Sequence, residues 1–363
     1  MRLSSRLPDF PWDTLSDARH TANAHPDGIV DLSVGTPVDH TPQFAIEALK
    51  SFGDAHGYPT VWGTPETRRA IAGYLERRWC SIPLADQCVL PVIGTKEVVG
   101  WLPTLLGIGA GDCVVFPTCA YPTYEVGALT AGAVPVALDD PSAIPEGTAL
   151  IWINSPANPS GRVLSLDELR AFVRAARDHD AVLASDECYG EFAWDAEPFS
   201  VLDPRVNDGD LTGLLALHSL SKRSNAAGYR AGFVAGDPEI VAELVAVRKH
   251  LGMMVPGPIQ GAMISLLADQ AHVEEQRERY LARRALLRPA LEAAGFRIDH
   301  SEGSLYLWVT RGEPCRETVA WLAERGILAA PGDFYGPSSA RHVRIALTAT
   351  DERIAAAAAR LVA

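Results

Sequence analysis

HSLSKRSNAAGYRAGFVAGD, residues 218–237, joins two apolar runs and holds a lysine between them. The run GLLAL (213–217) leads into this stretch, and AGFVAG (231–236) closes it. Short apolar runs bounded by glycine and serine are typical of buried β-strands. Lys222 therefore stands just past the end of a predicted strand. It is either an ordinary solvated loop residue or a reactive amine at the edge of a buried sheet.

Four earlier runs repeat this pattern. They are CVLPVIG (88–94), DCVVFP (112–117), ALIWIN (149–154) and AVLASDE (181–187). Helical segments separate several of them, and the segment that starts at Ser165 has Glu168 three residues later, which is the spacing of a capping box. Strands that are apolar on both faces and alternate with helices predict a mostly parallel central sheet covered by helices, an α/β fold.

The pattern changes after residue 256. A long helical stretch is predicted over residues 258–294, and it is followed by strand-like FRIDH (296–300), SLYLWVT (304–310), ILAAPG (327–332) and HVRIALT (342–348). These elements predict a second, smaller α+β domain. We expect an N-terminal segment (1–40) that packs with the small domain, a large ligand-binding domain (41–260) and a small C-terminal domain (261–363).

Composition narrows the cellular context and the partners. The chain has 363 residues and a formal net charge of −13, which argues against nucleic acid or an anionic membrane as a partner. No apolar stretch approaches the roughly 20 residues that span a bilayer, and the N-terminal residues lack the apolar core of a signal peptide. The six cysteines show no CxxC motif and no disulfide framework. We therefore expect a cytoplasmic protein with reduced thiols.

Residues that follow the predicted strands are the candidates for a ligand site, because ligands of parallel α/β sheets bind outside the carboxyl ends of the strands. These positions are Gly94, Thr95, Lys96, Tyr121, Tyr124, Asn154, Asn158, Asp186, Tyr189, Ser219, Ser221, Lys222 and Arg230. No GxGxxG follows the first strands, so a nicotinamide site is not expected. HExxH and paired Cys/His sets are lacking, which argues against a metal site, and no GxSxG marks a nucleophilic serine. Pyridoxal phosphate does need such a set: a lysine for its aldehyde, an anion for its ring nitrogen, and donors for its phenolate oxygen and phosphate.

Four motifs in this region resemble those of the class I/II aminotransferases of fold type I, which use pyridoxal phosphate. The family's S-x-S-K and G-x-R read here as Ser219-Leu-Ser-Lys222 and Gly228-Tyr-Arg230. Its N-P-x-N-P-T-G loop reads NSPANPSG (154–161), with serine in place of threonine, and its D-E-x-Y reads DECY (186–189). The motifs follow one another in the family's order and spacing, and the resemblance covers nearly the whole chain.

The resemblance implies a role for each matching residue. Lys222 binds the cofactor's aldehyde and moves the proton at the substrate Cα, while Asp186 pairs with the pyridine nitrogen. Asn158 and Tyr189 donate to the phenolate oxygen. Tyr121 stacks on one face of the ring, with Cys188 packed on the other. The phosphate is held by a further set, which is Gly94, Thr95, Lys96, Ser219 and Arg230.

Further similarities lie outside the central motifs. HVRIALT resembles the family's late F-V-R-I strand, which makes Arg344 the candidate for the substrate's α-carboxylate. GYPTVWGTPETRRAI (57–71) resembles Y-x-x-x-x-G-x-x-x-x-R, whose tyrosine, here Tyr58, reaches the phosphate of the neighbouring subunit and so implies a homodimer. DLSVGTP (31–37) matches a segment that places Gly35 beside the substrate.

Within the family, the chain most resembles the N-succinyldiaminopimelate aminotransferases, in stretches such as LPDFPWDTL (7–15), LPVIGTKE (90–97) and RKHLGMMVP (248–256). The implied reaction converts N-succinyl-LL-2,6-diaminopimelate and 2-oxoglutarate to N-succinyl-2-amino-6-oxopimelate and glutamate, a step of lysine and diaminopimelate biosynthesis. The candidates for binding the carboxylate and amide groups at the far end of this substrate are Arg162, Arg223 and Arg341. The chain departs from the subfamily's pattern at Trp62, Asn225 and again Arg223, and these departures could alter substrate specificity.

Several alternatives remain at the level of the sequence. The scaffold also suits an aminotransferase for another amino acid, aromatic or aliphatic, and a carbon–sulfur lyase. A transcription regulator can carry an aminotransferase-like domain beside a helix-turn-helix, but the acidic balance opposes DNA binding. A protein that kept only the fold could have lost Lys222 or Asp186, and both are present.

Overall fold

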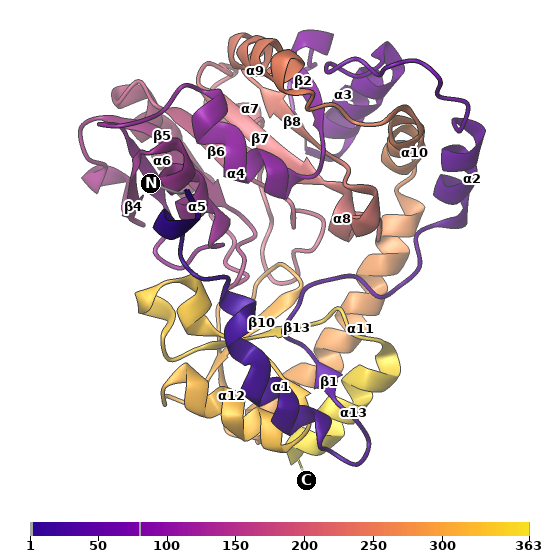
Figure 1. Cartoon of the computed structure of the whole chain (residues 1–363), viewed down its shortest axis with the longest axis vertical. Coiled ribbons are helices and arrows are strands. Elements are labelled where there is room, and N and C mark those ends of the chain that lie inside the picture. Colours follow the sequence, from indigo (N-terminus) through magenta and orange to yellow (C-terminus); the bar gives the residue numbers. More distant parts are fainter. Residues whose placement is uncertain (1–2, 80, 363) are drawn as a thin grey trace.

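A seven-stranded mixed sheet forms the centre of the larger part of the molecule, drawn in the upper half of Figure 1. The computed structural model describes residues 3–79 and 81–362. Across the sheet the strands follow in the order β2 (Val89–Val92), β8 (Gly232–Gly236), β7 (Leu214–Ser219), β6 (Val182–Asp186), β5 (Thr148–Asn154), β3 (Cys113–Phe116) and β4 (Val134–Ala137). The last five run parallel to one another, and β8 is antiparallel to both of its neighbours. The predicted mostly parallel sheet is confirmed.

Helices cover both faces of this sheet. They are α2 (Gln43–Ser51), α3 (Pro65–Trp79), α4 (Thr95–Leu105), α5 (Thr123–Ala131), α6 (Leu166–Asp178), α7 (Pro204–Asn207), α8 (Leu220–Arg223), α9 (Pro238–Leu251) and α10 (Gly257–Ala268). On β5, Ile151 and Ile153 join the core beneath α3, α6 and α10, whereas Leu150 and Trp152 join the core beneath α4, α5 and α9. This is why the strand is apolar at consecutive positions. The predicted capping box is also confirmed, at the start of α6.

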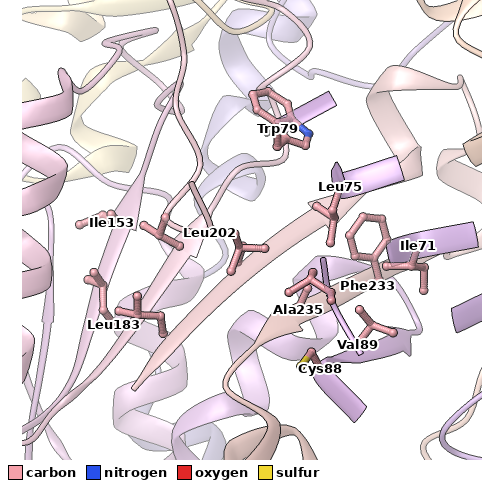
Figure 2. Close-up of a cluster of buried hydrophobic side chains, with 14 of the residues drawn as sticks. Ile71, Leu75, Trp79, Cys88, Val89, Ile153, Leu183, Leu202, Phe233 and Ala235 are labelled. Carbon is pink, nitrogen blue, oxygen red and sulfur yellow. The ribbon is translucent and has the colours of Figure 1, made fainter. Parts of the chain in front are cut away.

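Helix α3 shows how these faces are held together. Figure 2 shows Ile71 and Leu75 of α3 beside Phe233 of β8, in one cluster of buried side chains. The two aliphatic side chains are four residues apart and therefore share one face of the helix. Truncating a buried side chain of this size to alanine costs about 2–5 kcal/mol of stability in protein cores. This packing fixes α3 on the sheet.

A four-stranded antiparallel sheet organises the smaller part, drawn in the lower half of Figure 1. Its order is β12 (Ala330–Pro331), β13 (Val343–Ala346), β10 (Tyr306–Thr310) and β9 (Arg297–Asp299). Its helices are α11 (Ala271–Ala293), α12 (Cys315–Glu324) and α13 (Asp351–Val362), which share a hydrophobic core with the sheet. The predicted smaller α+β unit is confirmed.

The single helical stretch predicted over residues 258–294 is wrong, because two helices occupy it. Helix α10 ends at Ala268 and α11 begins at Ala271. The Asp269 carboxylate accepts the backbone N–H of His272 at 2.9 Å and so caps the first turn of α11. In Figure 1, α11 descends from the upper part of the molecule into the lower part.

The N-terminal segment packs on the smaller unit through a helix and a short strand. Helix α1 (Ser16–Asn23) contacts α12, and β1 (Val30–Asp31) pairs in parallel with β11 (Ile327–Leu328). Arg283 of α11 then binds the Asp39 carboxylate through two nitrogens, at 2.7 and 2.8 Å. The domain boundaries near residues 40 and 260 stay a prediction.

Two sequence-wide properties can be followed in the structure. None of the described helices is both long enough and apolar enough to cross a membrane. Cys88, Cys113, Cys119, Cys188 and Cys315 have free thiols, and Cys80 lies outside the described residues.

Candidate active site

A pocket of about 680 Å³ lies at the carboxyl ends of β5, β6 and β7, and residues of the smaller unit close one side of it. Most of the predicted site residues line it, namely Gly35, Thr95, Lys96, Tyr121, Asn158, Asp186, Tyr189, Ser219, Lys222, Arg230 and Arg344. They come from all parts of the chain, since Gly35 belongs to the N-terminal segment and Arg344 to β13. The structure brings these residues together, whereas the roles assigned to them stay predictions.

Lys222 lies in the short helix α8, directly after β7. The Ser219 hydroxyl oxygen accepts the backbone N–H of Ser221 at 3.1 Å and so starts this helix. The Lys222 ammonium nitrogen donates to the Gly35 carbonyl oxygen at the pocket wall. Burial lowers the pKa of Lys222, because desolvation disfavours the charged amine. This amine is therefore closer to its neutral, nucleophilic form than a surface lysine is.

Asp186 ends β6 and is only 7% exposed. Its carboxylate accepts the Tyr124 hydroxyl at 2.9 Å and the Cys188 backbone N–H at 3.2 Å. Burial raises the pKa of Asp186, since the charged form loses its water, although these hydrogen bonds oppose that rise. Among the ion pairs of the described residues, none includes Asp186. A buried carboxylate of this kind suits a ligand that brings its own positive charge.

An anion-binding corner adjoins these residues where β2 turns into α4. Gly94 has φ +80° and precedes Thr95, the first residue of α4, so the backbone N–H groups of Thr95 and Lys96 have no partner within the helix, whereas that of Glu97 donates to the Gly94 carbonyl. Glycine suits position 94 because its φ is positive, and a side chain there would also displace the Arg230 guanidinium. Arg230 is exposed and gives one nitrogen to the Ala227 carbonyl at 2.9 Å, which leaves further donors for a ligand. Helix N-terminus and arginine together suit a phosphate.

A buried arginine closes the opposite side of the pocket. Arg344 is 3% exposed and donates to the Asn158 side-chain oxygen and the Ser33 carbonyl, both at 2.7 Å. Its Nε atom is buried without a hydrogen-bond partner. Among the described residues no carboxylate pairs with this guanidinium, so an anionic ligand such as a substrate carboxylate suits it.

Asn158 is held by its own loop as well as by Arg344. The Asn154 side-chain oxygen accepts the Asn158 backbone N–H at 2.7 Å, while the Asn154 amide nitrogen donates to the Asp186 carbonyl at 2.8 Å. This arrangement ties the loop after β5 to the end of β6. Because the Asn158 oxygen is engaged by Arg344, its amide nitrogen is left as a donor for a ligand.

Two predicted cofactor residues differ in their placement, because Lys96 lines the pocket and Tyr58 does not. The Lys96 ammonium lies 5.8 Å from the centroid of the Phe10 ring, at the wall formed by the N-terminal segment. Tyr58 is 99% exposed and lines a different hollow, together with Trp62. A single chain therefore does not bring Tyr58 to its own pocket, and its role toward a neighbouring subunit stays a prediction.

The three arginines suggested for a substrate's distal groups do not line the pocket. Arg162 pairs with Glu168, and Arg223 is buried 3.5 Å from Glu191. Arg341 also lies outside the pocket wall. The structure gives no support to that suggestion, which stays a prediction, because the Arg162 and Arg223 guanidinium groups pair with carboxylates of the fold and Arg341 lies outside this pocket.

The structure adds pocket residues to which no role was assigned from the sequence. Phe10, Trp12 and Arg19 come from the N-terminal segment, and Tyr306 comes from β10. Tyr124 contacts Asp186 from α5. The stretch CAYPTY did place Tyr124 after a strand, but nothing local indicates its partner. Among the described residues, no group of three or more His, Cys, Asp or Glu side chains is placed to hold a metal ion.

Comparison with known proteins identifies the family. Residues 27–361 match the family described as aminotransferase class I and II. The chain is 60% identical to the probable aminotransferase Rv1178 of Mycobacterium tuberculosis over 99% of this chain and 86% of that one. It is 55% identical to the 4-dedimethylamino-4-oxo-anhydrotetracycline transaminase OxyQ of Streptomyces rimosus, over 98% of this chain and 99% of that one. An aminotransferase structure from Staphylococcus aureus superposes with a TM-score of 0.90 at 26% identity, covering 100% of this chain and 98% of that one. The chain belongs to the class I and II aminotransferases, which use pyridoxal 5′-phosphate.

Proposed function

We propose that this aminotransferase exchanges an amino group between N-succinyl-LL-2,6-diaminopimelate and 2-oxoglutarate, as the resemblance to the N-succinyldiaminopimelate aminotransferases implies. The observation that carries this proposal is a further cation that lines the pocket from a different element than Arg344. Lys96 lines the pocket beside the N-terminal segment and forms no ion pair with any described residue, whereas Arg344 lies on the wall made by β13. A substrate with one carboxylate at its reacting centre and others at its far end matches two such cations.

The described residues fit pyridoxal phosphate. A pocket of about 680 Å³ is large enough for the cofactor and a substrate side chain. The corner formed by Gly94, Thr95 and Arg230 suits the phosphate, and Asp186 has no cation of its own. When bound, the cofactor supplies an aldehyde for the substrate's amine and a ring that withdraws electron density from the substrate Cα.

Each site residue then has a task set by its surroundings. Lys222, whose pKa is lowered by burial, would take the proton from the substrate Cα and deliver it to the carbon of the cofactor's former aldehyde. Asp186 holds a proton on the ring nitrogen, since a buried negative charge favours a cation beside it. Arg344 binds the α-carboxylate and so fixes the Cα near Lys222. Asn158 and Tyr189 donate to the phenolate oxygen.

A second substrate class is favoured by the aromatic side chains at the same wall. The rings of Phe10 and Trp12 lie 5.6 Å apart, and both residues line the pocket with Tyr121. Flat rings of this kind suit an aromatic oxo acid or a ring ketone such as the one named for OxyQ.

A carbon–sulfur lyase on the same scaffold would release ammonia and a sulfur compound and would need no amino acceptor.

A panel of acceptors tests the proposal. With glutamate as donor, we expect kcat/KM for N-succinyl-2-amino-6-oxopimelate to exceed that for phenylpyruvate by about 100-fold, since the distal carboxylates bind only in the first case. Faster turnover of phenylpyruvate would favour the aromatic class. Release of ammonia from a sulfur-containing amino acid, without any acceptor, would favour the lyase.

Lys96→Met should raise KM for the succinylated substrate about tenfold with kcat little changed, because the lost contact is present in both ground and transition states. Steady-state kinetics measures this. Lys50→Met is the matched control, because Lys50 lies on the surface of α2 and pairs with Glu47. An unchanged KM in the Lys96 variant would remove Lys96 from the distal site.

We also propose a homodimer with the site at its interface. Tyr58 is almost fully exposed, and the apolar side chains of Phe52 and Leu251 are 49% and 55% exposed. Single exposed apolar side chains are ordinary on protein surfaces, so the proposal rests on Tyr58, which matches the family tyrosine that reaches the phosphate of the neighbouring subunit. Light scattering of the active enzyme should give about twice the chain mass of 39.0 kDa. A fully active species with the mass of one chain would contradict the shared site.

A further inference from the structure

Tyr306 occupies the point where three proposed site residues meet. It lies on β10, is 3% exposed and lines the pocket. Its hydroxyl oxygen is 2.9 Å from the hydroxyl oxygen of Tyr189, and both are buried. The Arg344 guanidinium carbon lies 4.0 Å from its ring centroid, and a side chain at position 35 would overlap its phenol. The last contact explains why glycine stands at position 35.

Two phenols that share one hydrogen bond must divide the roles of donor and acceptor. If Tyr189 donates its proton to the cofactor's phenolate oxygen, its own oxygen can only accept from Tyr306. Tyr306 is then the donor of the pair. A hydroxyl that accepts one hydrogen bond becomes a stronger donor in the next, and this effect is greatest where water is excluded.

The position of Arg344 also favours a hydrogen bond that Tyr306 donates to Tyr189. A cation over the face of an aromatic ring interacts with the ring's electrons. A guanidinium over the Tyr306 ring draws electron density away from its hydroxyl and makes that hydroxyl a better donor than acceptor. The residue proposed to bind the substrate carboxylate is thus coupled, through Tyr306, to the residue proposed to bind the cofactor.

We infer that Tyr306 is a positioning residue, which sets the hydrogen-bond direction of Tyr189 and strengthens its donation to the cofactor. The inference rests on the proposed role of Tyr189. It predicts that the Tyr306 hydroxyl alters the electronic state of the bound cofactor without touching the reacting atoms.

The pH dependence of the bound cofactor's visible absorbance tests this, because that absorbance would change as the Lys222 nitrogen joined to the cofactor loses its proton, and Tyr189 would act on this proton through the cofactor's phenolate oxygen. Weaker donation by Tyr189 leaves more negative charge on that oxygen, so the proton is held more tightly. Tyr306→Phe should therefore raise the midpoint of the titration by about 0.5–1 pH unit. Tyr189→Phe should raise it further.

The double variant and a matched control separate this role from a structural one. Adding Tyr306→Phe to Tyr189→Phe should leave the midpoint of Tyr189→Phe unchanged, because the hydroxyl through which Tyr306 acts is gone. Tyr335→Phe is the control. Tyr335 is buried near Arg344, with its ring centroid 5.1 Å from the guanidinium carbon, but its hydroxyl has no hydrogen-bond partner. Its midpoint should match that of the unmodified protein.

The other possible results distinguish a failure of the inference about Tyr306 from a failure of the role proposed for Tyr189. A shift with Tyr189→Phe but none with Tyr306→Phe would overturn the inference and leave the proposed function intact. Additive shifts in the double variant would also overturn it, because Tyr306 would then act by another route. No shift with Tyr189→Phe would remove Tyr189 from the cofactor and would overturn both its proposed role and the inference that rests on it.

Discussion

Lys222→Ala should lower kcat for transamination by about 10⁴-fold or more, because no other described amine is placed to move the proton at the substrate Cα. Lys96 is the other lysine that lines the pocket, and its ammonium lies beside the Phe10 ring instead. The loss should be in kcat, since Arg344 still binds the carboxylate. Single-turnover mixing with glutamate, followed by absorbance, measures the affected step directly.

The Lys222 variant should still retain the cofactor, but without a covalent bond. The phosphate corner of Gly94, Thr95 and Arg230 is unchanged by the substitution, and so is Asp186. Dialysis should therefore remove the cofactor from the variant faster than from the unmodified enzyme. Near-normal turnover in the variant would exclude Lys222 from the role given to it here.

Asp186→Asn should lower the rate by several orders of magnitude, about 10³-fold, with the pocket otherwise intact. Asparagine keeps an acceptor oxygen for the hydroxyl of Tyr124, which now donates at 2.9 Å. It carries no charge, so the ring nitrogen loses its proton and the ring withdraws electrons poorly. Steady-state kinetics, together with a thermal unfolding measurement, separates the chemical loss from any loss of stability.

Asp237→Asn is a matched control for this substitution. Asp237 is also buried, at 7% exposed, but it caps α9 by accepting backbone N–H groups at the opposite end of the sheet. Asparagine can serve as a cap there, so turnover should remain near normal. A near-normal rate in Asp186→Asn as well would show that the ring nitrogen needs no buried anion.

The sequence predicts those parts of the site that depend on one strand and the few residues after it. Asp186 follows a buried strand, and Lys222 follows the next one, and parallel strands bring their carboxyl ends to one edge of a sheet. Both residues therefore line one pocket in the structure. The fold class could be predicted for the same reason, because the strands are apolar at consecutive positions.

Contacts between distant elements could not be predicted in this way. Tyr124 comes from α5 and meets Asp186 62 residues later, while Tyr306 comes from the smaller sheet and meets Tyr189. Strand β4 was not predicted because Pro135 stands inside its apolar run VPVA, and a proline within such a run is tolerated only in a strand at the edge of a sheet, which is where β4 lies. Arg223 follows Lys222 in sequence, yet its side chain lies in a buried ion pair with Glu191.

Borohydride reduction of the yellow protein, followed by peptide mapping, tests the central claim most directly. The reduction fixes the cofactor to whichever amine holds it. The account predicts a pyridoxyl group on Lys222, in the peptide that spans HSLSK, at one group per chain. A pyridoxyl group on Lys96 or on any other amine, or no adduct at all, would contradict it.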